Sequence, residues 1–175
     1  MPAFPESSPS MPVVAVTKRA LFSAAHHYWL PEWSEAENRW TFHACSNRFG
    51  HGHNYALSIT VEGPVDPETA MVVNLNVLKR VLREEIVERL DHTHLNHQVP
   101  FFRTHVPTLE NLCLYCWHRL LPCLEPLGLR LTRLRLVENE TLWAEYLGGP
   151  VPWLDPTAIT GEPATLEHPH AVPVP

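Results

Sequence analysis

Alternation of hydrophobic and polar residues predicts four β-strands. The clearest alternation runs through residues 53–61, where one face collects Tyr55, Leu57, Ile59 and Val61. A similar pattern predicts a strand over residues 13–24, and we expect these two strands to pair. Residues 129–138 and 141–147 predict a closing hairpin with its turn at Glu138-Asn139-Glu140.

Hydrophobic residues spaced three and four apart predict two amphipathic helices between the strand pairs. The first spans residues 74–90, with Asn74 or Asn76 as its N-cap, and the second spans residues 108–121, capped by Thr108. Helices grouped between strand pairs are typical of an α+β layer. The predicted fold is an antiparallel four-stranded sheet with two helices packed on one face.

Proline is concentrated at the two ends of the chain. Of the 18 prolines among 175 residues, four lie within residues 1–12 and seven within residues 150–175. Proline lacks a backbone donor and interrupts helices and sheets. We therefore expect a Pro-rich N-terminal arm over residues 1–12, one folded domain over residues 13–149 and a Pro-rich tail over residues 150–175.

The charge balance argues against a nucleic-acid partner. Thirteen Lys and Arg residues against 19 Asp and Glu residues give a formal net charge of −6, the wrong sign for binding a phosphate backbone. No stretch approaches about 18 apolar residues, and the first ten residues lack the features of a secretory signal. We therefore expect no membrane span and a cytoplasmic location.

The four cysteines fit reduced thiols better than a disulfide framework, because three of them fall in an apolar, helix-patterned stretch. Within it, Cys113 and Cys116 form a single Cys-x-x-Cys pair on the expected buried face, which favours core packing over metal binding. Cys45 lies instead in a polar, turn-like segment. Its thiol is a candidate general base if a dication lies nearby, and an inert, partly buried thiol is the alternative.

Histidine is abundant, with 12 in the chain, and two of them predict a metal site. His51 and His53 are two residues apart on a strand, so their side chains point to the same face. A catalytic zinc site needs about three protein ligands and one open position. His26 or His27, at the end of the first strand, could supply the third ligand. The alternative is a solvated histidine pair that binds no metal.

Two further positions carry candidate chemistry. Asp91 and His92 are adjacent in a loop, where the carboxylate could orient the imidazole for proton transfer; exposed histidines at a helix end are the alternative. Glu138 ends its strand in phase with buried leucines, so its carboxylate should face the covered side and need a partner. A ligand with two N–H donors could be that partner, as could an arginine or a backbone group.

Several motifs in order along the folded unit resemble one family, the 6-pyruvoyltetrahydropterin and 6-carboxytetrahydropterin synthase superfamily, whose fold is called the tunnelling fold. The motifs are Phe22-Ser-Ala-Ala-His26, Cys45-x5-His51-Gly-His53-Asn54-Tyr55, Met71-Val-Val-Asn-Leu75, Leu90-Asp-His92-x-x-Leu95-Asn96, Val99-Pro-Phe-Phe102, Pro107-Thr-x-Glu-Asn111, and Glu138 followed by Trp143-Ala-Glu-Tyr146. Residues 13–149 would then form a pterin synthase domain.

The resemblance implies roles for individual residues. His26, His51 and His53 would bind one zinc ion per subunit, and Cys45 would abstract a proton opposite the Asp91–His92 pair. Glu138 would anchor the 2-amino and N3 edge of the pterin, with Thr108 and Glu110 at further pocket positions. The implied substrate is 7,8-dihydroneopterin triphosphate, which Mg²⁺ could accompany. The implied assembly is a barrel-shaped homohexamer, a dimer of trimers with pterin sites between subunits.

The chain departs from the family pattern at two places. His27 replaces a basic residue frequent after the first zinc histidine, so triphosphate contacts could differ, with Lys18 and Arg19 as candidate replacements. Leu109 replaces a hydroxyl residue often found before the glutamate. The retained Cys45 argues against the family's aldolase subgroup, which has a glutamate at this position.

Two reactions share this machinery within the superfamily. One eliminates triphosphate to give 6-pyruvoyltetrahydropterin, and the other releases acetaldehyde to give 6-carboxytetrahydropterin on the queuosine, or 7-deazaguanine, route. The spacing Cys-x5-His-Gly-His and the run through Val99-Pro-Phe-Phe102 favour the first. Alternatives of another class are a non-catalytic pterin- or metal-binding module and a structural zinc protein.

Overall fold

The sheet has five strands, one more than the sequence predicts. The computed structural model describes residues 11–161, and its strands are β1 (Val13–His26), β2 (His51–Pro64), β3 (Thr93–His94), β4 (Arg130–Asn139) and β5 (Leu142–Tyr146). Their order is β3-β1-β2-β4-β5. The four predicted strands pair antiparallel, but β3 joins the edge parallel to β1, so the sheet is mixed. The expectation of a four-stranded antiparallel sheet was wrong here, because a two-residue strand is too short to show alternation.

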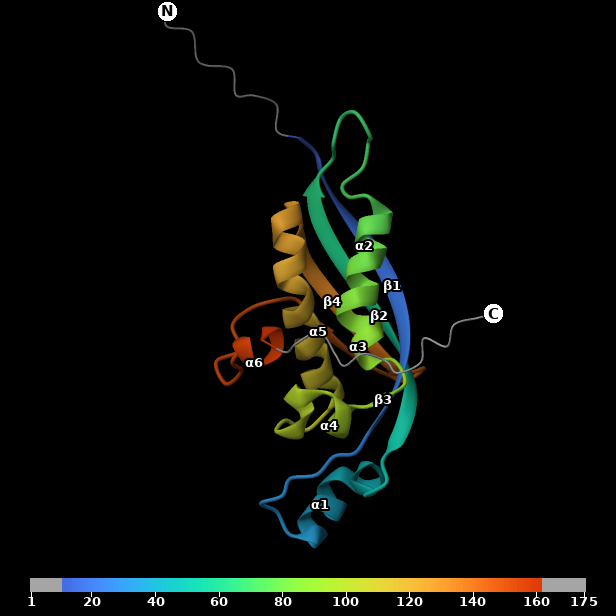
Figure 1. Cartoon of the computed structure of the whole chain (residues 1–175), viewed down its shortest axis with the longest axis vertical. Helices are drawn as coiled ribbons and strands as arrows, with labels where there is room; N and C mark the ends of the chain where they lie inside the picture. Colours follow the sequence, from blue (N-terminus) through green and yellow to red (C-terminus); the bar gives the residue numbers. More distant parts are fainter. Residues whose placement is uncertain (1–10, 162–175) are drawn as a thin grey trace, which may run out of the picture.

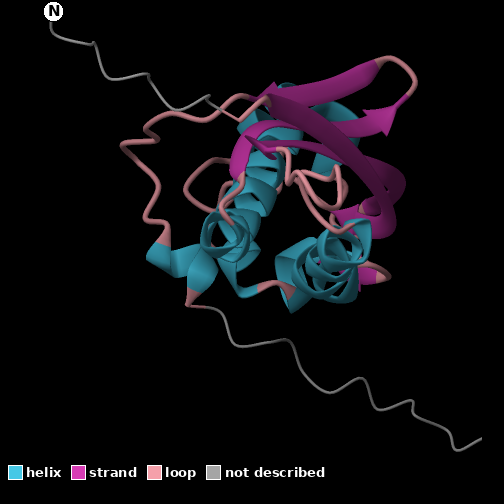
Figure 2. Cartoon of the chain, turned by 90° about the horizontal axis from the view of Figure 1, so that it is seen from above, coloured by secondary structure: helices cyan, strands magenta, loops and turns pink. Residues whose placement is uncertain are grey.

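Two long helical segments cover one face of the sheet, as predicted (Figures 1 and 2). The first comprises α2 (Leu75–Leu82), a π-helical turn (Arg83–Val87) and α3 (Glu88–Leu90), and Asn74 caps it. The second is α5 (Leu109–Leu124), which begins after the Thr108 cap and continues through Pro122, three residues beyond the predicted end.

The core lies between these helices and the sheet. The predicted inward residues of β2, from Tyr55 to Val61, are at most 1% exposed, which confirms the alternation. Cys113 and Cys116 are also buried and free, as expected for core packing.

Short helices in the connections were not predicted. The β1–β2 connection contains α1 (Glu35–Phe42) and a 3-10 turn (His43–Ser46), and Figure 1 shows α1 beyond the end of the sheet. Further short helical segments are α4 (Leu95–Gln98), Pro100–Arg103, Glu125–Leu127 and α6 (Thr157–Thr160). Each is too short for a clear 3.6-residue periodicity.

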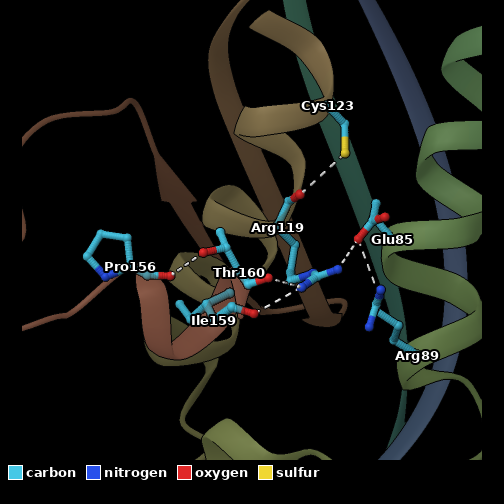
Figure 3. A network of polar contacts seen from close by, with 7 residues as sticks. All are labelled: Glu85, Arg89, Arg119, Cys123, Pro156, Ile159 and Thr160. Atoms are coloured by element: carbon cyan, nitrogen blue, oxygen red, sulfur yellow. Dashed lines mark hydrogen bonds and ion pairs between the residues drawn. The ribbon is translucent and has the colours of Figure 1, made fainter. Parts of the chain in front are cut away.

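A polar network attaches α6 to the domain (Figure 3). Arg119 of α5 donates to the Ile159 carbonyl oxygen at 2.9 Å and also pairs with Glu85, which Arg89 contacts at 3.3 Å. Leu154 and Ile159 are buried in the core. The start of the expected tail, residues 150–161, therefore packs on the domain, whereas residues 1–10 and 162–175 of the expected arm and tail lie outside the described residues. Within residues 11–161, no helix combines the length and apolarity that a membrane crossing requires.

Candidate metal and substrate site

Three histidines meet on the helix-covered face at the end of the β1–β2 ladder. The register pairs His26 with His51 and Ala24 with His53, so all three imidazoles lie on one face. The Nε2 atoms of His26 and His51 are 3.3 Å apart, and the His53 ring centroid lies 5.1 Å from that of His26 and 4.8 Å from that of His51. These residues form a group that could hold a metal ion. Of the two candidates for the third position, the structure brings His26 to the pair.

Burial keeps the triad uncharged. His26 is 1% exposed, and burial, reinforced by His51 and His53, lowers its pKa to about 3. Burial also lowers the pKa values of His51 and His53. Neutral imidazoles at pH 7 keep a nitrogen lone pair available to a metal.

Two tyrosines contact the triad and were not predicted as site residues. The Tyr55 hydroxyl lies 3.1 Å from His26 Nδ1 and is hydrogen-bonded to it. The Tyr28 ring lies 4.8 Å from that of His26, and burial, with Glu138 and Cys45 nearby, raises the Tyr28 pKa above its usual range. Tyr55 was assigned to the core and Tyr28 stands in a loop, so only the position of Tyr28 two residues after His26 could have indicated its role.

The Cys45 thiol lies beside the triad, 3.8 Å from His51 Nε2. It sits in the 3-10 turn after α1, where its carbonyl oxygen accepts a hydrogen bond from the Tyr28 amide at 2.7 Å. Burial raises the pKa of this thiol, and Glu138 adds to the shift. Without an ion in the site, the thiol is therefore protonated at neutral pH.

Glu138 brings a carboxylate to the same face, as its phase in β4 predicts. Its Oε1 lies 3.1 Å from His53 Nε2, and its side chain is 8% exposed. Its Oε2 is buried without a hydrogen-bond partner among the described residues. Burial raises the pKa of Glu138, partly offset by His51, and Glu110 raises it further. The unpaired oxygen can accept a donor from a ligand.

Thr108 and Glu110 lie where α5 begins. The Thr108 hydroxyl caps the helix by accepting a hydrogen bond from the Asn111 amide at 3.2 Å. Glu110 is exposed in the first turn, close enough to Glu138 and Tyr28 to influence their pKa values. The structure thus brings Glu110 near the triad and gives Thr108 a capping contact.

Asp91 and His92 pair with each other but lie away from Cys45. Asp91 Oδ2 is 2.9 Å from His92 Nδ1, and Asp91 Oδ1 accepts a hydrogen bond from the Ser23 amide at 2.7 Å. His92 borders a pocket of about 450 Å³ with Ser23, Ala25 and Asn54, which alternate with the triad residues along their strands. The pair therefore lies on the uncovered face, and within one chain it does not join Cys45.

Comparisons with known proteins agree with this fold. The sequence model of 6-pyruvoyl tetrahydropterin synthase matches residues 15–149. A 6-pyruvoyl tetrahydrobiopterin synthase of Drosophila melanogaster is 45% identical over 106 residues, covering 61% of this chain but only 63% of that protein. The Homo sapiens protein of that name is 40% identical over 133 residues, covering 76% of this chain and 90% of its own length. A solved 6-pyruvoyl tetrahydropterin synthase of Caenorhabditis elegans superposes with a TM-score of 0.74 at 35% identity, covering 79% of this chain and 98% of that one.

The α+β layer with a histidine triad on its covered face defines a pterin synthase of the tunnelling-fold class. The chain belongs to the 6-pyruvoyl tetrahydropterin synthase family.

Proposed function

We propose that this protein is a zinc-dependent lyase that converts 7,8-dihydroneopterin triphosphate to 6-pyruvoyltetrahydropterin by eliminating triphosphate. One observation carries the proposal: three imidazoles, a thiol and a carboxylate oxygen that has no hydrogen-bond partner within residues 11–161 converge on one face. Such a site offers metal ligands, a base and a substrate anchor together. The names of the relatives support the same reaction.

The donor set of His26, His51 and His53 fits zinc. Nitrogen ligands in a tetrahedral zinc site lie about 3.3 Å apart, which matches the 3.3 Å between Nε2 of His26 and of His51. A proton on Nδ1 of His26 would be donated to the Tyr55 oxygen, which leaves Nε2 free as a ligand. When bound, zinc supplies Lewis acidity toward the side-chain oxygens of the substrate.

The protein side chains would bind the pterin and move protons. Glu138 Oε2 would accept the N–H donors at the 2-amino and N3 edge, with Glu110 and Thr108 lining the same end. Cys45, beside the metal ligands, would take a proton from the substrate side chain once the positive charge of the metal lowers its pKa.

The acid opposite Cys45 would come from a second subunit. Asp91 and His92 lie on the uncovered face of their own chain, so they can serve a site only if a neighbouring chain brings its triad to them. This requirement supports an oligomer, and the proposal takes its form, a barrel-shaped homohexamer built as a dimer of trimers, from the family resemblance. The proposal includes a cytoplasmic enzyme, with the four free cysteines in support.

A product assay tests the reaction. The full-length protein is incubated with 7,8-dihydroneopterin triphosphate, Zn²⁺ and Mg²⁺; the pterins are separated by chromatography, and triphosphate and acetaldehyde are measured. We expect triphosphate and 6-pyruvoyltetrahydropterin without acetaldehyde. Acetaldehyde with 6-carboxytetrahydropterin would instead identify the 6-carboxytetrahydropterin synthase reaction. Pterin and zinc binding without any turnover would identify a non-catalytic module.

A further inference from the structure

A second group of three histidines lies next to the first and has no role in the proposed reaction. His27 follows β1, His94 lies in β3 and His97 lies in α4, and one nitrogen from each lies within 4.8 Å of the other two. The ring centroids of His94 and His97 are 4.2 Å apart, and that of His27 is 5.7 Å from His94 and 5.9 Å from His97.

The second triad lies beside the end of β1, at the edge where β3 joins the sheet. His27 is the first residue after β1, and its ring lies beside those of His94 and His97. His94 pairs with Ala25 in the parallel β1–β3 ladder. The two triads are separate groups of ligands.

The backbone around the second triad is held in place by specific contacts. The Asn96 side chain accepts a hydrogen bond from the His27 amide at 2.9 Å and donates one to the His27 carbonyl oxygen at 3.0 Å. The His94 amide donates to Gln98 Oε1 at 2.5 Å. Two segments distant in sequence, the end of β1 and residues 94–98, are thereby fixed with their imidazoles together, the kind of surrounding support that metal sites use.

Gly50 makes room for the His94 ring. A Cβ atom at this position would lie 2.9 Å from His94 Nε2 and 2.6 Å from the His26 carbonyl oxygen, and the Gly50 φ of +71° also disfavours other residues. The ring therefore occupies a space that only glycine leaves open.

The imidazoles of this cluster have unused nitrogens. Nδ1 of His27 and Nδ1 of His94 are buried and have no hydrogen-bond partner among the described residues. A buried polar atom without a partner indicates a ligand, ion or water that completes it. His27 and His97 also line a pocket of about 460 Å³, together with Glu32 and Arg103, which gives an ion a path from solvent.

We propose that His27, His94 and His97 form a second metal site, selective for borderline transition-metal dications such as Zn²⁺. Imidazole nitrogens suit these ions, whereas Mg²⁺ and Ca²⁺ require oxygen ligands. Tetrahedral coordination would draw the nitrogens from within 4.8 Å to about 3.3 Å of one another. The exposed His97 can move inward to accommodate this change.

Counting bound zinc in the full chain tests the proposal. Metal-free protein is loaded with ZnCl2, desalted and measured by inductively coupled plasma mass spectrometry. We expect two zinc ions per chain in the wild type, one in His97→Ala and two in His43→Ala, a matched control at an exposed histidine outside both triads. Loading with Mg²⁺ instead should leave no bound ion. A His97→Ala protein with the wild-type zinc content would overturn the second site.

The variant His51→Ala tests the first metal site separately from the second, because it removes a ligand of the first triad only. The failure of this proposal and the failure of the proposed function can therefore be told apart. His51→Ala should retain one ion, and the double variant His51→Ala/His97→Ala should retain none. If the wild type binds a single ion that His51→Ala loses and His97→Ala keeps, the second site is refuted and the first stands. The reverse pattern supports the second site and refutes the first.

The affinity for zinc distinguishes an ordered metal site from weak, nonspecific binding to surface histidines. Competition with a chromophoric chelator should give two dissociation constants for zinc in the wild type. His97→Ala should raise one of them at least tenfold. Equal and weak binding of the second ion in both proteins would overturn the proposal. His27→Gln should give the same result as His97→Ala, and it provides the test if His97→Ala does not fold. Circular dichroism checks the folding of both variants.

Discussion

At the residue scale, Glu138 lies beside the histidine triad and keeps one carboxylate oxygen available for the proposed substrate. One carboxylate oxygen contacts His53 at 3.1 Å, while the other is buried without a partner among the described residues. Desolvation of an unpaired carboxylate oxygen is unfavourable. Because burial also raises its pKa, donors from a bound ligand would favour the ionised form. In the proposed reaction, this open hydrogen-bonding position would make Glu138 an anchor for a group with N–H donors.

Glu138→Gln should weaken substrate binding while keeping the shape of the site. The amide retains an acceptor but loses the charge, and a hydrogen bond to a charged group contributes about 1.5–3 kcal/mol. We therefore expect KM to rise about 10- to 100-fold, with zinc still bound. Steady-state kinetics and metal analysis measure both, and Glu140→Gln, at the exposed hairpin turn, is the control. An unchanged KM would exclude Glu138 as the anchor.

Cys45→Ala should abolish turnover and leave the zinc content intact. The thiol lies beside His51 but is not part of the histidine triad, so its loss removes a proton acceptor and no metal ligand. General-base catalysis contributes about 10²- to 10⁴-fold, and we expect kcat to fall in this range. Cys123→Ala, at another half-buried free thiol, provides the comparison and should be unaffected. Wild-type kcat in Cys45→Ala would remove the thiol from the mechanism.

At the element scale, the β1–β2 connection places the thiol. Asn38 in α1 is fully buried, and its side-chain hydrogen bonds hold this connection together. Its Oδ1 accepts a hydrogen bond from the Leu30 amide at 2.8 Å, and its Nδ2 donates to the carbonyl oxygens of Leu30 and Ser34 at 2.9 and 3.1 Å. The connection is thereby folded on itself, and the 3-10 turn that carries Cys45 continues from α1.

Asn38→Ala should therefore affect both stability and catalysis. The half-buried Leu30 amide would lose its acceptor, and the carbonyl oxygens of Leu30 and Ser34 would each lose one of two donors, which costs about 1–3 kcal/mol of unfolding free energy. Movement of the turn would also lower kcat, whereas the zinc ligands in the sheet should keep their metal. Chemical denaturation, kinetics and metal analysis check this against Asn76→Ala, at an exposed helix position. Unchanged stability and kcat would contradict this role of α1.

Sequence patterns predict the helices and strands in which hydrophobic residues recur at a regular spacing. They miss the elements that depend on tertiary contacts. Alternation predicts which residues of the two long strands share a face. The register itself is seen only in the structure, where it places His51 opposite His26 and His53 two residues further along the same face. In contrast, α1 depends on the hydrogen bonds of Asn38, and β3 depends on pairing with the edge of β1. Tyr28 joins the site through a loop without any periodicity. The family resemblance supplied residue roles that such patterns alone leave open.

At the scale of the whole molecule, the candidate chemistry is divided between two faces of one sheet. The covered face carries the first triad, Cys45 and Glu138, and the uncovered face carries Asp91 and His92. A proton donor on the far side of a sheet cannot reach a substrate bound to the covered face of the same chain. Oligomerisation is thus a chemical requirement of the proposed reaction.

Two inactive variants should therefore complement each other when they are mixed. Cys45→Ala and His92→Ala each lack one proton carrier, but a Cys45 from one chain can meet a His92 from its neighbour in a mixed oligomer. Random assembly of equal amounts gives both groups in about a quarter of the sites. We expect about that share of wild-type activity after the variants are unfolded and refolded together, and none after separate refolding. If the mixture stays inactive although mass spectrometry detects mixed oligomers, the two residues do not act in one shared site.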